Sequence, residues 1–226
     1  MISWEQLPPH MQTDAVRPYY EMLCKRRMAL FWKRIFDMIA SLLLIVLLSP
    51  VLLVLAVLIK KDSPGPVFYR QERVTEGGRI FRIFKFRTMV VNADQLGSLV
   101  TTAGDSRITG LGQKIRGSRL DEIPQLFNIL KGDMSFVGTR PEVPKYVEAY
   151  TDEMNATLLM PAGVTSIASI TYKKEDERIA ELTAKGLTVD EAYVRYILPE
   201  KMQYNYEYLR SFGFFRDIAI CIKTLL

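Results

Sequence analysis

The chain has 226 residues and a net charge of +5, and 49% of its residues are hydrophobic, which fits either one domain or a domain with an appendage. Two cysteines without metal-ligand spacing and a single histidine argue against a zinc site and against a disulfide framework. The positive charge permits nucleic acid, anionic lipid or phosphorylated substrates as partners without choosing among them. We expect no signal peptide, because the first apolar run begins too far along the chain.

That apolar run covers residues 38–59 and contains no charge. As a helix it would be about 33 Å long, so length alone favours a transmembrane helix. Basic residues flank it on both sides, however, and such residues favour the cytoplasmic side of a membrane. Near its centre, Pro50 bends a helix and Ser49 can bond back to a carbonyl of the preceding turn. We therefore predict a re-entrant helix over 33–61, with all soluble residues on the cytoplasmic face.

Charged residues stand at the start of the predicted membrane helix. Asp37 follows Arg34 by three positions and Lys33 by four, so these side chains meet on one helix face. They form either an ordinary interfacial ion pair or an anchor for the base of the membrane helix. The residues before them, 1–32, are predicted to be an N-terminal interfacial segment.

The remaining part, 62–226, is predicted to be the functional domain. The segments VFYRQERV and RIFRIFKFRTM, separated by TEGG, indicate a β-hairpin. Residues 188–210 indicate polar-aromatic helices whose tyrosines either face lipid headgroups or pack in the core. Residues 214–226 are amphipathic and lie either in the membrane interface or against the domain. The predicted fold class is mainly α with a small β-hairpin.

The stretch SRLDEIPQLFNILKGDMSFVGTRPE holds an acidic pair at the start of a helix with an apolar face. Pro124 fits only a first helical turn, which makes Asp121 the N-cap or close to it. The pair could simply cap the helix and lie on the surface. A helix N-terminus also binds phosphate, however, and a carboxylate there can attack phosphorus while Mg²⁺ offsets the charge repulsion. Arg116 and Arg140 bracket the pair and are candidates to hold phosphate oxygens.

Four elements together resemble the bacterial sugar transferase family, in particular its small monotopic polyprenyl-phosphate phosphoglycosyl transferases. These are the Ser-Pro-interrupted helix, FKFRTM, the acidic stretch above and PAGVTS, and the resemblance runs from about residue 33 to the C-terminus. It implies a monotopic protein of the bacterial cytoplasmic membrane with its catalytic domain on the cytoplasmic face. Such enzymes transfer a phosphosugar from a UDP-sugar to undecaprenyl phosphate, release UMP, use Mg²⁺ and begin glycan assembly, as for capsule or exopolysaccharide.

The resemblance also implies roles for single residues. Asp121 would carry a covalent phosphosugar in a ping-pong mechanism, and Glu122 would act as a base or help to organise the metal ion, so that both are candidate metal ligands. The implied substrate-binding residues are Lys85, Arg87, Arg116, Gly138, Arg140 and Pro141, and the implied membrane-helix residues are Arg34, Asp37, Ser49 and Pro50. The family often has proline where this chain has Thr139, directly before the arginine of the Arg-Pro element.

Two other classes of protein are weighed against this reading. The interpretation as a nucleic-acid-binding or anionic-lipid-binding protein rests on net charge alone. The absence of a nucleic-acid motif leads us to expect no nucleic-acid partner. A non-catalytic membrane scaffold of the same fold would tolerate Asp121→Asn. The sequence leaves open the sugar, the glycan pathway and the oligomeric state, a homodimer included.

Overall fold

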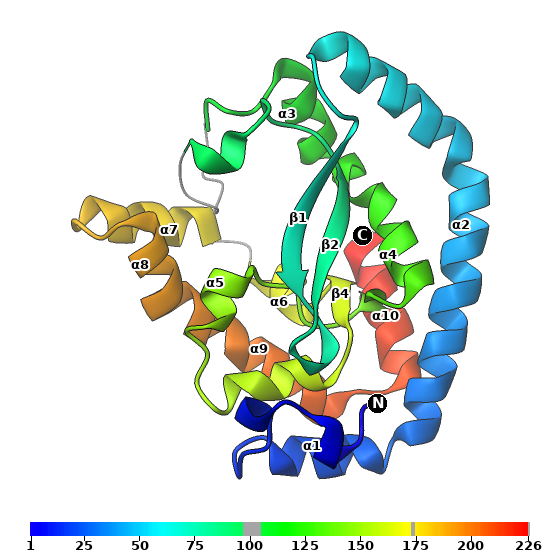
Figure 1. Cartoon of the computed structure of the whole chain (residues 1–226), viewed down its shortest axis with the longest axis vertical. Coiled ribbons are helices and arrows are strands. Elements are labelled where there is room, and N and C mark those ends of the chain that lie inside the picture. The colour runs from blue at the N-terminus through cyan, green and yellow to red at the C-terminus, as the bar shows by residue number, and fades with distance from the viewer. Residues whose placement is uncertain (97–104, 173–174, 226) are drawn as a thin grey trace.

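A long helix runs along one edge of the molecule, and a β-hairpin lies between it and a group of shorter helices (Figure 1). The computed structural model describes residues 1–96, 105–172 and 175–225. The α-helices of these residues are α1 (Arg17–Cys24), α2 (Arg27–Asp62), α3 (Gly110–Gly117), α4 (Leu126–Lys131), α5 (Pro144–Val147), α6 (Ile167–Thr171), α7 (Glu175–Ala184), α8 (Val189–Ala192), α9 (Leu198–Ser211) and α10 (Phe214–Leu225). Short 3₁₀ turns are η1 (Trp4–Gln6), η2 (Pro9–Met11), η3 (Glu76–Gly78), η4 (Ala93–Gln95), η5 (Leu120–Gln125) and η6 (Met154–Leu159), and η7 (Tyr193–Ile197) is a π-helical turn.

The predicted hairpin is confirmed, and a second small sheet was not predicted. Strands β1 (Phe68–Val74) and β2 (Ile80–Phe86) pair antiparallel. Strands β3 (Met134–Val137) and β4 (Ala162–Thr165) pair in parallel, so the prediction of a single hairpin was incomplete. A Cβ on Gly138 would lie 2.5 Å from the carbonyl oxygen of Pro161, so glycine allows the chain to approach closely where this pair ends.

Helix α2 packs against the domain along its whole length. It begins at Arg27, six residues earlier than predicted, and continues through Pro50 to Asp62. Ser49 donates to the carbonyl of Val46 at 2.8 Å, as expected for a serine beside a proline in an apolar helix. The residues on its packed face recur at helical spacing, and they are Lys33, Asp37, Ser41, Leu44, Ile45, Leu48, Leu52, Leu55, Ala56 and Ile59. Both ends of the helix therefore contact the same domain, and Figure 1 shows the helix curving around it.

The opposite face of α2 is apolar and exposed. It is formed by Phe31, Trp32, Ile39, Leu42, Leu43, Val46, Leu47, Leu53, Val54 and Val57. An unbroken apolar surface of this length marks a contact with a membrane or another protein. By length and composition α2 is also apolar enough to enter a bilayer.

A buried charge pair holds the start of α2 to the last helix. Lys33 forms an ion pair with Asp217 of α10 and donates to the carbonyl of Val137 at 2.8 Å. The hydroxyl of Tyr208 donates to the same carboxylate at 3.1 Å. Both charged side chains are less than a tenth exposed, so each would be costly to bury without the other. The amphipathic segment at the C-terminus thus packs against the domain and α2, although Phe215 remains 82% exposed.

Arg34 and Asp37 also bond to the domain rather than to each other. Arg34 donates to the carbonyls of Ile129 and Leu130, at 2.6 and 3.0 Å, at the C-terminal end of α4. The carboxylate of Asp37 accepts from the backbone N–H of Phe136 at 3.2 Å. Of the two interpretations offered by the sequence, these contacts fit an anchor at the base of α2 and not a local ion pair.

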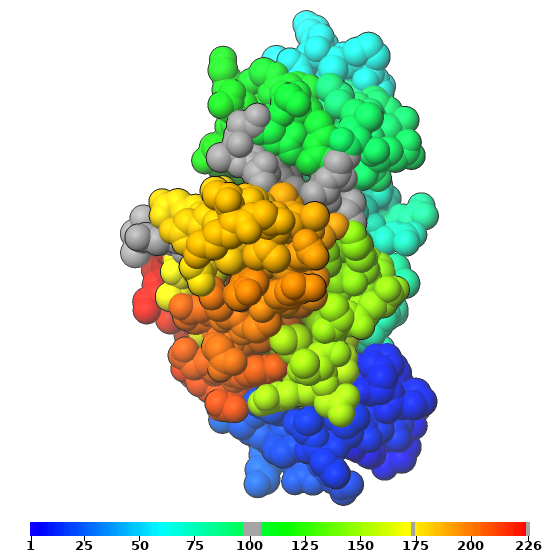
Figure 2. Space-filling view, turned by 90° about the vertical axis from the view of Figure 1, so that its left-hand side faces the viewer, coloured from blue at the N-terminus to red at the C-terminus, as the bar shows by residue number. Residues whose placement is uncertain are grey.

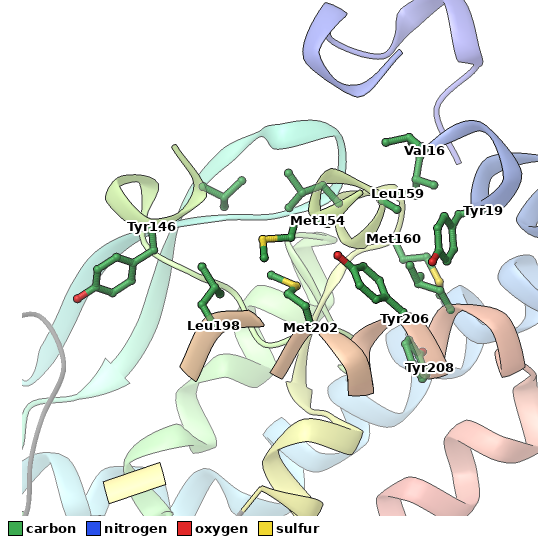
Figure 3. Close-up of a cluster of buried hydrophobic side chains, with 14 of the residues drawn as sticks. Val16, Tyr19, Tyr146, Met154, Leu159, Met160, Leu198, Met202, Tyr206 and Tyr208 are labelled. Carbon is green, nitrogen blue, oxygen red and sulfur yellow. The ribbon is translucent and has the colours of Figure 1, made fainter. Parts of the chain in front are cut away.

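The main core lies at the end of the molecule where the chain begins. Met11 and Leu23 of the N-terminal segment are fully buried in it. Figure 2 shows this segment, in dark blue, against the lower part of the domain. In Figure 3, Val16 and Tyr19 come from that segment and face the η6 and α9 side chains, among them Leu159 and Tyr206. The segment predicted to be interfacial thus contributes to the domain core; its position relative to a membrane stays a prediction.

The C-terminal tyrosines mostly follow the core-packing interpretation. Tyr193, Tyr206 and Tyr208 are buried, whereas Tyr196 is 41% exposed. Helix α9 carries Tyr206 on the face that includes Met202, next to the residues of η6 (Figure 3). Because α9 is anchored in this core, the side chains of its first turn also have fixed positions.

Candidate active site

The acidic pair lies in a 3₁₀ turn, not at the start of an α-helix. After α3 ends, Arg119 adopts a left-handed conformation with φ of +54°, and η5 follows with Asp121 and Glu122 in its first turn. Helix α4 begins only at Leu126, so the prediction that Asp121 is its N-cap was wrong. Pro124 explains the difference, because it has no N–H to donate to the carbonyl four residues earlier. The carboxylate of Asp121 is thereby freed from capping.

Asn128 of α4 connects this turn to the hairpin. Its side-chain oxygen accepts from the backbone N–H of Phe84 at 2.8 Å, and its amide nitrogen donates to the carbonyl of Arg82 at 3.1 Å. Asn128 is fully buried, so both bonds are shielded from water. They fix the position of the acidic pair relative to Lys85, which follows Phe84 in β2.

Glu122 is held by two cations. Its Oε1 accepts from Lys85 at 3.1 Å and from Arg140 at 2.8 Å. Burial alone would raise the pKa of the Glu122 carboxyl, but Arg140 and Lys85 outweigh it and hold that pKa well below its ordinary value. Burial lowers the pKa of the Lys85 ammonium, against the opposing effect of Glu122. The two cations therefore favour the ionised form of Glu122, which in turn holds both positive charges in place.

Asp121 has the opposite electrostatic character. Its side chain is buried, at 8% exposure, and no ion pair joins it to any residue that the structure describes. Burial raises the pKa of the Asp121 carboxyl, with a further rise from Glu122, while Lys85 and Arg116 oppose the rise. Adjacent carboxyl groups whose pKa values are driven apart are typical of catalytic sites. Asp121 is thus a partly desolvated carboxylate that forms no ion pair with any described residue.

We predict that Asp121→Asn stabilises the folded protein at neutral pH. A carboxyl whose pKa is raised in the folded state contributes stability below its unfolded pKa, near 3.8, and loses it as the pH rises through the folded value. Asparagine removes the buried charge and should raise the thermal midpoint by about 3 °C at pH 7, with the gain shrinking below pH 4. Glu122→Gln, which removes a carboxylate stabilised by its neighbours, should lower the midpoint. A lower midpoint for Asp121→Asn at pH 7 would contradict this reading.

Most of the predicted catalytic and substrate-binding residues line one cavity of about 690 Å³. It lies between the hairpin and the helices on the other side of the molecule, and its wall includes Lys85, Arg87, Arg116, Asp121, Arg140 and Pro141. Arg87 uses its two terminal guanidinium nitrogens to donate to the carbonyls of Ser63 (2.7 Å) and Pro64, just after the end of α2. Gly138 is not among the lining residues and allows close chain packing at the end of β3, and Glu122 lies behind the wall. Their roles toward a substrate stay predictions.

Four further residues of the cavity wall were not predicted from the sequence. Arg73 of β1 donates to the carbonyl of Pro141 at 3.0 Å, and its Nε is buried without a partner among the described residues. Glu142, Tyr193 and Lys201 form a connected group at the far side. The strand alternation could have indicated Arg73, since it shares a face with Tyr69, the partner of Lys85. Nothing local indicates the other three, which lie up to 59 residues apart.

The cavity can hold an anionic group in front of Asp121. Lys85 and Arg116 act on that carboxylate, and Arg140 and Arg73 add further cations to the same wall. Guanidinium groups bind phosphate oxygens through paired N–H donors. A ligand with two phosphates would be drawn to these cations, and one of its phosphorus atoms would face a carboxylate without a fixed partner. This arrangement suits phosphoryl transfer to or from an aspartate.

Comparison with known proteins agrees with this chemistry. Residues 28–226 match the family described as bacterial sugar transferase. The chain is 37% identical over 198 residues to an Aeromonas hydrophila protein named UDP-N-acetylgalactosamine-undecaprenyl-phosphate N-acetylgalactosaminephosphotransferase, an alignment that covers 86% of this chain and 43% of that protein. It is 33% identical over 196 residues to a UDP-glucose:undecaprenyl-phosphate glucose-1-phosphate transferase of Caulobacter vibrioides, covering 85% of this chain and 68% of the relative.

A third relative shows that the sugar varies. An undecaprenyl-phosphate galactose phosphotransferase of Salmonella typhimurium is 31% identical over 214 residues, covering 88% of this chain and 40% of that protein. The chain therefore spans less than half the length of two of these three relatives. The names of these relatives agree on undecaprenyl phosphate and differ in the sugar, which is N-acetylgalactosamine, glucose or galactose.

Proposed function

The chain belongs to the bacterial sugar transferase family, and on that premise we propose that it transfers a sugar-1-phosphate from a UDP-sugar to undecaprenyl phosphate. The observation that carries the proposal is Asp121, a buried carboxylate without an ion-pair partner among the described residues, facing a cavity lined by Lys85, Arg116 and Arg140. The products are UMP and an undecaprenyl-diphosphate-sugar.

The proposed reaction has two displacements at one phosphorus atom. A carboxylate oxygen of Asp121 attacks the phosphorus that bears the sugar, the bond to the bridging oxygen breaks, and UMP leaves with the electron pair. The phosphosugar is then joined to Asp121 as an acyl phosphate. An oxygen of undecaprenyl phosphate attacks the same phosphorus, the bond to Asp121 breaks, and the free carboxylate is restored. Because UMP leaves before undecaprenyl phosphate reacts, the kinetics are ping-pong.

Glu122 serves this reaction by positioning cations. Its low pKa and its bonds to Lys85 and Arg140 make it a poor proton acceptor, which favours organisation of the site over the base role. Lys85 and Arg140 are thereby fixed before substrate binds, and fixed charges stabilise the charge that moves onto the leaving phosphate. Arg116, on the last turn of α3, contacts the other side of the same phosphates in this proposal.

The donor set fits Mg²⁺ held jointly with substrate. No group of three or more metal-ligating side chains occurs among the described residues, but Mg²⁺ commonly takes one or two carboxylates and completes its shell with phosphates and water. Asp121 and Glu122 are the residues that would hold it, since both bonds to Glu122 use Oε1 and leave Oε2. When bound, Mg²⁺ would supply positive charge that offsets the repulsion between carboxylates and diphosphate.

The lipid acceptor is proposed to reach the cavity from the membrane beside the end of α2. Phe68, Val90 and Val91 line the cavity and are each more than a third exposed. Val91 also packs closely on Gly65, in the turn that follows α2. An apolar rim next to an apolar helix would let a polyprenyl chain stay in lipid while its phosphate approaches Asp121.

We propose that α2 is re-entrant at the bacterial cytoplasmic membrane, with the catalytic domain on the cytoplasmic face. Both ends of α2 pack on one domain, which supports placing them on the same side of a bilayer, and the basic flanks favour the cytoplasmic side. We predict that cysteines replacing Ser3 and Asp62, one before and one at the end of α2, both resist an impermeant maleimide added to intact cells. Labelling of either position before lysis would contradict the topology.

Release of UMP tests the proposed function. Purified protein with undecaprenyl phosphate and Mg²⁺ is offered UDP-glucose, UDP-galactose and UDP-N-acetylgalactosamine, and UMP is measured. We expect release from at least one donor, lost when EDTA removes the metal ion. A protein that binds membranes and folds normally, yet releases UMP from none of a wide set of UDP-sugars, would favour the scaffold instead.

A further inference from the structure

The cavity has two ends with different chemistry. Its rim near α2 is formed by apolar, exposed side chains, whereas its far end is formed by Glu142, Glu175, Tyr193 and Lys201. Sequence neighbours connect each end of the cavity to one cation of the site. Lys85 lies two residues before Arg87, which is at the α2 side, and Arg140 lies two residues before Glu142, which is at the far end. Glu122 joins Lys85 to Arg140, so the acidic pair lies between the two ends.

The polar end is a buried and connected group. Tyr193 donates to Oε1 of Glu142 at 2.6 Å, and Lys201 donates to the Tyr193 hydroxyl at 3.0 Å. Lys201 also pairs with Glu175 at 3.3 Å. Glu142, Tyr193 and Lys201 are each less than a tenth exposed. Tyr193 and Lys201 both contact Oε1 of Glu142, so its Oε2 remains for a ligand that fills the cavity.

An unusual turn places Tyr193 in this group. The π-helical turn Tyr193–Ile197 interrupts the path from α8 to α9. Pro199 follows it and cannot donate to the carbonyl of Arg195, which removes one bond of a regular α-helix. Widened turns of this kind occur frequently at functional sites. The cost of the interruption suggests that the position of Tyr193 is useful in itself.

The position and donor set of this end fit a sugar. In a UDP-sugar the sugar is bonded directly to the phosphorus that Asp121 attacks, whereas uridine lies one phosphate further away. A carboxylate oxygen, a phenol and an ammonium group match neighbouring hydroxyl or acetamido groups, which both donate and accept hydrogen bonds. The ring of Tyr193 already contacts Tyr146, with centroids 4.7 Å apart, and Lys201, so it is poorly placed to stack on a base.

We propose that Glu142, Tyr193 and Lys201 form the subsite that recognises the sugar of the donor. This inference rests on the proposed function, and it adds that the sugar of the donor binds at the polar end of the cavity. Glu142 accepts from sugar hydroxyl groups through Oε2, and Tyr193 and Lys201 hold that carboxylate in place. The three residues thus determine which UDP-sugar reacts, while the cations around Asp121 bind the diphosphate common to all donors.

Tyr193→Phe tests the subsite, with Tyr196→Phe as a matched control on the exposed side of the same turn. UMP release is measured with UDP-glucose, UDP-galactose and UDP-N-acetylgalactosamine, together with inhibition by UMP. We expect Tyr193→Phe to change the ratio of kcat/KM between the best donor and its competitors by about tenfold, as for a lost buried hydrogen bond. Inhibition by UMP should change less than about twofold, and Tyr196→Phe should leave every value unchanged.

Several outcomes would overturn the subsite. An equal loss for all donors would indicate a structural role, and an equal weakening of UMP inhibition would place uridine at this end. If Tyr193→Phe does not fold, Glu142→Gln gives the same test, because it keeps an acceptor for Tyr193 and removes the charge offered to the sugar. If the ratios of kcat/KM between donors are unchanged in an active enzyme, only the subsite is ruled out. If the wild-type chain releases no UMP, the proposed function and the subsite are both ruled out.

Discussion

Asp121→Asn is expected to lower the rate of UMP release about a thousandfold or more. The amide of asparagine cannot attack phosphorus, and the neighbouring carboxylate of Glu122 is already paired with Lys85 and Arg140. The fold should survive, because the substitution keeps the shape of the side chain and removes a buried charge. UMP release, circular dichroism and flotation with liposomes measure the three properties on one preparation.

The matched control for this substitution is Asp152→Asn. Asp152 is exposed and does not line the cavity, so its charge is solvated and its loss should leave the rate unchanged. If Asp121→Asn retained a tenth or more of the wild-type rate, Asp121 would not be the nucleophile. That result would return the acidic pair to a structural role and would revive the scaffold interpretation.

Arg140→Gln is expected to lower kcat/KM for the donor about a hundredfold. Arg140 faces the cavity and balances the charge of Glu122, so its removal takes one cation from the diphosphate and leaves Glu122 with Lys85 alone. The pKa of the Glu122 carboxyl should rise at the same time, because Arg140 is the largest influence that lowers it. Steady-state kinetics with varied UDP-sugar measures the loss.

Arg82→Gln is the control for this loss of a cation. Arg82 lies on the hairpin next to the site but pairs with Glu72 on the exposed face, so it should not affect the reaction. A fall of less than about threefold for Arg140→Gln, or an equal fall for Arg82→Gln, would show that Arg140 does not hold the diphosphate. The proposed positioning role of Glu122 would fail with it.

The features that the sequence predicted are those set by neighbouring residues. The hairpin follows from two apolar and β-branched runs around TEGG, and α2 follows from an uncharged run between basic flanks. The acidic pair stood out because charged residues directly precede an apolar helix. The N-cap assignment of Asp121 failed because the left-handed Arg119 and Pro124 together produce a 3₁₀ turn, which local patterns seldom distinguish from a first helical turn.

The features that were missed depend on contacts between distant parts of the chain. Lys33 forms its ion pair with Asp217, which lies 184 residues later, although the carboxylate of Asp37 lies only four residues away. Glu142 meets Tyr193 across 51 residues, and each looks like an ordinary polar residue within its own segment. Strands β3 and β4 have four residues each and are too short for an alternating pattern to be recognised.

Intact-mass measurement of the protein shows whether the covalent phosphosugar forms on Asp121. The chain is incubated with Mg²⁺ and a UDP-sugar that it turns over, in the absence of undecaprenyl phosphate, and is then denatured and weighed. We expect a mass increase equal to one sugar-1-phosphate less one water, located at Asp121 by fragmentation and absent in Asp121→Asn. An active chain that never gains this mass, with any donor from which it releases UMP, would rule out the covalent intermediate.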